Sequence, residues 1–74
     1  MAYSIFKGSR GTTIVCSKSA GADTFDVYIF AGDDGDNEKD LDPVGIIRGA
    51  PNVPRALDMA EGYIQGYFSR KESL

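Results

Sequence analysis

Six carboxylates crowd into one short stretch of this chain, and they are its most distinctive chemical feature. One base, Lys39, accompanies them, so the stretch carries −5, while the whole chain carries −3 and the rest of it therefore +2. Closely spaced carboxylates create a negative potential that attracts a cationic surface and holds it. This acidic stretch, residues 33–42, is predicted to bind a partner through Asp33, Asp34, Asp36, Glu38, Asp40 and Asp42.

Two other interpretations of the acidic stretch stay open. A solvated loop that aids solubility accounts for the charge without any partner. Alternating carboxylates also resemble a calcium-binding loop. The EF-hand pattern counted from Asp34 needs Gly at its sixth position and Glu at its twelfth, where Lys39 and Gly45 stand. A weak calcium-binding or structural module is thus an alternative function, and no metal site is predicted.

The chain has no histidine and a single cysteine, Cys16. Ser-His-Asp and Cys-His nucleophile pairs and histidine-ligated metal sites are therefore excluded. Cys16 is in phase with Ile14 in a strand-like segment, which favours a small core residue. The acids gather in one polar loop rather than in an apolar cleft that would shift their pKa values. We expect a protein that is not an enzyme and needs no cofactor.

A second alternative is a small nucleic-acid-binding domain that uses the first hairpin. Lys7, Arg10 and Lys18 are expected near that hairpin, where Tyr3 and Phe6 could stack on bases. The acidic stretch would repel phosphates unless it lies at the opposite end. The main prediction is therefore no direct binding of nucleic acid.

The 74 residues suit one domain, because two would each be too small to bury a core. β-branched and aromatic runs bounded by glycine-rich turns predict four strands, and an apolar periodicity of three and four predicts a helix after them. The fold class is α+β, a four-stranded mainly antiparallel sheet packed by one C-terminal helix. The predicted bounds are strands at 3–7, 12–17, 24–31 and 44–48 and a helix from about Asn52, within one domain spanning 1–74.

The helix pattern also predicts which side chains it exposes. Its apolar stripe is expected to face the sheet and comprises Val53, Leu57, Ala60, Ile64 and Phe68. Gly62 and Gly66 fall on the opposite face, where each costs about 1 kcal/mol relative to alanine. Close approach by a partner, or tight packing within the fold, would compensate for that cost. Met59 and Tyr63 adjoin these glycines and are predicted to contact a partner.

One helix can cover only one face of a four-stranded sheet. The other face is expected to expose an apolar patch, which usually marks a partner or dimer surface. Alternatively, the sheet curls and long side chains cover it. The residues expected on this face are drawn from Phe6, Val15, Tyr28, Phe30 and Ile47.

A single cysteine allows no internal disulfide, and small secreted domains usually need such links. The first residues show no apolar run of signal-peptide length, and no segment approaches the roughly 20 apolar residues that span a bilayer. We expect a cytoplasmic protein that is a monomer or a weak homodimer.

A tiny acidic β-rich domain with a terminal helix resembles the small phage-encoded inhibitors of bacterial defence, including anti-CRISPR proteins. The residues that carry this resemblance are the ten from Asp33 to Asp42, read as DDGDNEKDLD. Several such inhibitors imitate nucleic-acid charge. The resemblance implies a CRISPR surveillance complex as the target, inhibition by blocking DNA access, and a bacterial host cell as the location.

Overall fold

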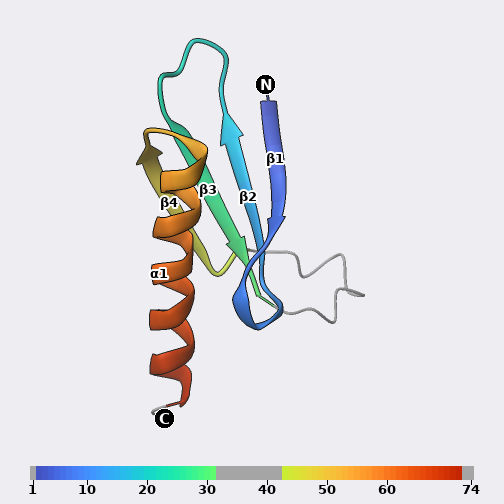
Figure 1. The fold of residues 1–74 in the computed structure, drawn as a ribbon, viewed down its shortest axis with the longest axis vertical. Helices are drawn as coiled ribbons and strands as arrows, with labels where there is room; N and C mark the ends of the chain where they lie inside the picture. The colour runs from blue at the N-terminus through green and yellow to red at the C-terminus, as the bar shows by residue number, and fades with distance from the viewer. Residues whose placement is uncertain (1, 32–42, 73–74) are drawn as a thin grey trace.

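A computed structural model describes residues 2–31 and 43–72. It contains a four-stranded sheet in the order β1-β2-β3-β4 with one helix packed on it, which confirms the predicted α+β class (Figure 1). The elements are β1 (Ala2–Lys7), a 3-10 turn η1 (Ser9–Gly11), β2 (Thr13–Lys18), β3 (Phe25–Phe30), β4 (Gly45–Ala50) and α1 (Val53–Glu72).

All three strand pairs are antiparallel. Alternation along β3 follows the sequence pattern: Val27 and Ile29 are fully buried, while Tyr28 between them is half-buried. The fourth strand runs two residues beyond its predicted end at Arg48. It accommodates Gly49 at a φ of 87°, a left-handed conformation that glycine adopts without a Cβ clash.

The core lies between α1 and the face of β2, β3 and β4 toward it. Ala56 and Ala60 are fully buried, and such small side chains let the helix backbone approach the sheet closely. Ile64 is the largest buried residue of the helix. The core comprises Ile14, Cys16, Val27, Ile29, Ala50, Ala56, Ala60 and Ile64.

The helix begins where the sequence predicts. The side-chain oxygen of Asn52 accepts a hydrogen bond from the backbone N–H of Arg55 at 2.9 Å, which satisfies one of the free donors of the first turn. Pro54 lies in that turn, where its missing N–H costs little. Arg70 and Lys71 lie in the last turn, where cations oppose the negative end of the helix dipole.

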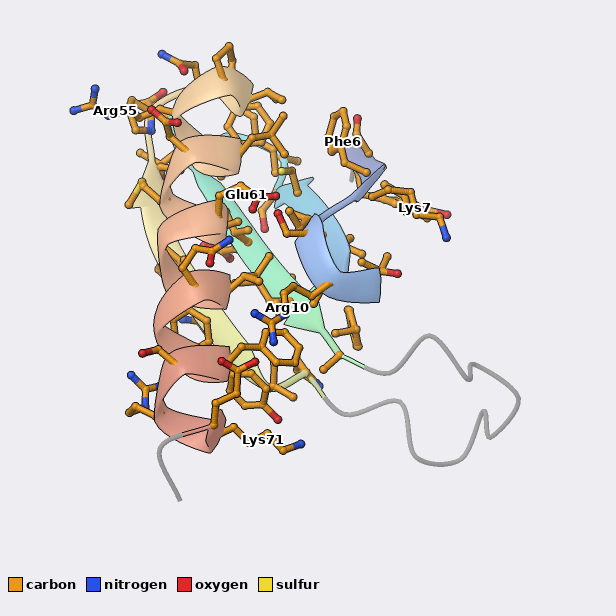
Figure 2. All side chains as sticks on the ribbon, turned by 60° about the horizontal axis from the view of Figure 1, so that its bottom comes forward. Phe6, Lys7, Arg10, Arg55, Glu61 and Lys71 are labelled. Atoms are coloured by element: carbon orange, nitrogen blue, oxygen red, sulfur yellow. The ribbon has the colours of Figure 1, made fainter. Side chains whose placement is uncertain are left out.

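The turn between β1 and β2 is tied to the helix. The N–H and hydroxyl of Ser9 both donate to the Glu61 carboxylate, at 3.2 and 2.6 Å. The Arg10 guanidinium lies 4.6 Å from the centre of the Phe68 ring and forms an ion pair with Glu72 (Figure 2). Arg10 has a φ of 60°, which is uncommon for a residue other than glycine. These contacts hold the turn against the middle and the C-terminal end of α1.

Two glycines are predicted to respond in opposite ways to alanine. A Cβ added to Gly62 meets no atom within 4 Å, so Gly62→Ala should stabilise the fold by about 1 kcal/mol through helix propensity. A Cβ at Gly45 would collide with the Tyr63 ring, so Gly45→Ala should cost about 1–3 kcal/mol. Urea unfolding followed by circular dichroism measures both. A destabilised Gly62→Ala would show that this helix face is packed.

Candidate protein-interaction surface

The sheet face opposite α1, here the open face, carries a line of apolar side chains across all four strands. The register places Ile5 beside Val15, Val15 beside Tyr28, and Tyr28 beside Ile46. Ile5 is 62% exposed and Ile46 is 46% exposed, while the two central residues are half-buried. These four residues, the apolar row, form one contiguous strip that reaches both edges of the sheet.

Two further lines of side chains flank the apolar row. Tyr3, Ser17, Asp26 and Arg48 align on one side, and Arg48 Nη1 lies 3.5 Å from Asp26 Oδ2. Both charged groups of this pair are partly exposed, and exposed pairs contribute at most about 1 kcal/mol. Tyr3 is 65% exposed and extends the apolar surface along β1. On the other side of the row stand Lys7, Thr13 and Phe30.

The expected patch on the uncovered face is therefore present, and it includes three of the five candidate residues. Val15, Tyr28 and Phe30 do lie on the open face. Phe6 and Ile47 instead pack against the core on the helix side. The physical reason is register: Ile47 pairs with Val27, which faces α1.

The sequence interpretation also missed Tyr3, Ile5 and Ile46, the three most exposed large apolar residues in the described part of the chain. Period-two alternation from Tyr3 would have placed Tyr3 and Ile5 together on one face. Ile46 and Ile47 are neighbours of the same type, so no local signal indicated which one points outward.

The predicted binding residues of the acidic stretch, Asp33, Asp34, Asp36, Glu38, Asp40 and Asp42, lie outside the described residues. The strand ends that flank this segment lie side by side. The Val44 N–H donates to the Ile29 carbonyl at 2.7 Å, so the chain leaves β3 and enters β4 at the same end of the sheet. Phe30 is at that end of β3, two residues along the strand from Tyr28 of the apolar row, which is a distance of about 7 Å.

The two predicted contact residues of the helix occupy different environments. Met59 is 37% exposed and lies on α1, on the opposite side of the sheet from the apolar row. Tyr63 is half-buried, and its hydroxyl donates to the Val44 carbonyl at 2.7 Å. The Tyr63 ring also lies against Gly45. Tyr63 thus fixes the start of β4, a role within the fold that the sequence did not indicate.

The structure does not bring the three bases of the first hairpin together. Lys7 and Lys18 lie at opposite ends of the β1–β2 pair, because Lys7 pairs with Thr13 and Lys18 with Ala2. Lys7 points away from the helix (Figure 2). The Arg10 guanidinium contacts the Phe68 ring and the Glu72 carboxylate. Lys18 Nζ lies 5.5 Å from the centre of the Phe25 ring.

Within 2–31 and 43–72, no three His, Cys, Asp or Glu side chains gather in a group able to hold a metal ion. In the same residues no helix has both the length and the apolar character needed to cross a bilayer. Comparison with family models, with curated proteins and with solved structures produced no match. The resemblance to phage-encoded inhibitors therefore stays a prediction from the acidic stretch.

Cys16 is buried in the core, with 1% of its surface exposed, as its position in the strand pattern predicted. Burial raises the pKa of its thiol above the ordinary value of 9.0. The thiolate is the reactive form of cysteine. The native thiol is therefore both shielded and protonated at neutral pH.

This burial predicts a pH dependence of stability. The raised pKa means that the unfolded chain loses the Cys16 proton first as pH rises, so the free energy of unfolding should fall above about pH 9. Cys16→Ala should remove that part of the fall, although it lowers stability at every pH. Urea unfolding of both chains between pH 7 and 10 measures the difference. Parallel curves would contradict the shifted pKa.

Proposed function

We propose that this chain is a non-enzymatic protein-binding module whose acidic stretch engages a cationic surface on a partner. The observation that carries the proposal is the concentration of charge: −5 within ten residues of a chain whose net charge is −3. The described strands on either side of that segment are joined, since the Val44 N–H donates to the Ile29 carbonyl. The carboxylates are thereby tethered to one end of the sheet.

The apolar row supplies the second half of a binding surface. Charge attraction acts over a Debye length, about 8 Å at physiological salt, and chiefly speeds the encounter. Apolar contact acts after water leaves the interface and does not weaken with salt. A partner docked on Phe30 and Tyr28 would meet the apolar row and lie beside the point where the acidic stretch is attached.

The specific form of the proposal is competitive inhibition of nucleic-acid binding. Surfaces that bind nucleic acid present lysine and arginine to phosphates. Carboxylates in place of those phosphates would occupy such a surface and block access to it. A CRISPR surveillance complex in the cytoplasm of a bacterial host is the target class implied by the resemblance to phage-encoded inhibitors.

The first expected outcome is salt-dependent capture. A pull-down from bacterial lysate should retain a cationic partner at 50 mM salt and lose most of it at 500 mM, because added salt screens the carboxylates.

With the partner identified, Asp33→Asn together with Asp34→Asn should slow its association about 10-fold. The matched control is Asp23→Asn with Asp58→Asn, which removes equal charge from exposed positions elsewhere and should leave the rate unchanged.

If the two double variants slow association equally, the acidic stretch acts only through the net charge of the chain. The proposal would then fail. The inhibitory form has its own test. The protein should displace a labelled DNA duplex from the partner in a gel-shift titration. A ternary complex of protein, partner and DNA would leave binding intact but refute inhibition by occupancy.

A further inference from the structure

In the part of the chain that the structure describes, the outer edge of β1 is unpaired along its whole length. Among the described residues β1 has a neighbour on one side alone, β2, and its six residue pairs from Ala2 to Lys7 run in one uninterrupted register. An edge strand presents alternate backbone N–H and C=O groups that can pair with a further chain. Tyr3 and Ile5 are more than 60% exposed, and Ser4 between them is exposed on the helix side.

The opposite edge differs in each of these respects. The β3–β4 register shifts between Phe25 and Asp26, and Gly49 takes a left-handed conformation. Arg48 adds a charge that is 69% exposed, and α1 packs on β4. Bulges, charges and a covering helix are the devices that prevent edge strands from pairing. β1 has one exposed charge, Lys7 at its end, and no proline.

We propose that two copies of this chain associate by antiparallel pairing of β1 with β1, with the two-fold axis at Ser4. Residues directly opposite in an antiparallel pair direct their side chains to the same face. This register therefore sets Tyr3 of each copy beside Ile5 of the other on the open face. Aromatic and β-branched residues form favourable cross-strand pairs, so the edge is complementary to itself.

The same register separates the like charges. Lys7 of the two copies stands six residue steps apart along the strands, about 20 Å, which is well beyond the Debye length at physiological salt. The two sheets become one sheet of eight strands, and both open faces lie on the same side of it. The proposal goes beyond the binding of a cationic partner, because it uses no residue of the acidic stretch.

Sedimentation velocity over roughly 5–500 µM protein tests the association. The wild-type chain should shift from monomer to dimer within that range, since a small strand-to-strand interface is expected to be transient. Ile5→Lys places a charge in the pairing edge and should abolish the dimer. Ile46→Lys, a change of the same kind in the same row but on β4, should leave the dimer fraction unchanged. Circular dichroism checks that both variants fold.

A disulfide test measures the register directly. In a Cys16→Ala chain, Ser4→Cys should form a crosslinked dimer on mild oxidation, because the two-fold axis brings the Ser4 positions together. Removing Cys16 is necessary because it is the β2 neighbour of Ser4. Lys7→Cys in the same background is the control, since a disulfide needs Cα atoms within about 7 Å. It should remain uncrosslinked under the same oxidation.

The outcomes are distinct. A monomer at all concentrations overturns the proposal, as does a dimer that survives Ile5→Lys. Loss of the dimer in both lysine variants would indicate face-to-face packing of the open faces instead, and equal crosslinking at positions 4 and 7 would refute the register. Failure of any of these leaves capture of a cationic partner untouched, because that capture is measured with different variants.

Discussion

The structure depends on one constraint: a single helix must bury the apolar side of a four-stranded sheet that is wider than the helix. Ala56 and Ala60 make this possible, because their small side chains let α1 lie close over Val27 and Ile29, which are fully buried. The helix is too narrow to do more. It packs over β2, β3 and β4, so Ser4 on the helix side of β1 stays exposed. The open face and the free edge follow from that geometry.

The helix is also longer than the strands it covers. Twenty residues extend about 30 Å, whereas a six-residue strand extends about 20 Å. The C-terminal end of α1 therefore projects past the sheet (Figure 1). The turn η1 runs along the helix toward that end: Ser9 bonds Glu61 at the middle of α1, and Arg10 lies on Phe68. Arg10 makes these contacts from an uncommon backbone conformation, with a φ of 60°.

The sequence patterns predicted the helix and the strands better than they predicted which residues lie on each face of the sheet. The class, the alternation of β3 and the cap at Asn52 all follow from local rules that neighbouring residues satisfy. The set of residues on the open face does not follow from local rules, because it depends on the pairing between strands that are distant in the sequence. Ile46 and Ile47 are equally apolar, and only the pairing of Ile46 with Tyr28 decides between them. The contact of Tyr63 with Gly45 likewise joins β4 to α1 and has no local signature.

The acidic stretch and the open face suit different stages of one encounter. Carboxylates attract at a distance and are weakened by salt, whereas the apolar row contributes only after contact. The short distance between the end of β3 and the apolar row would let one partner contact both under the proposed function. A two-fold axis at Ser4 reverses the strand direction from one copy to the other. The strand ends that flank the two acidic stretches would then lie at opposite ends of the joined sheet.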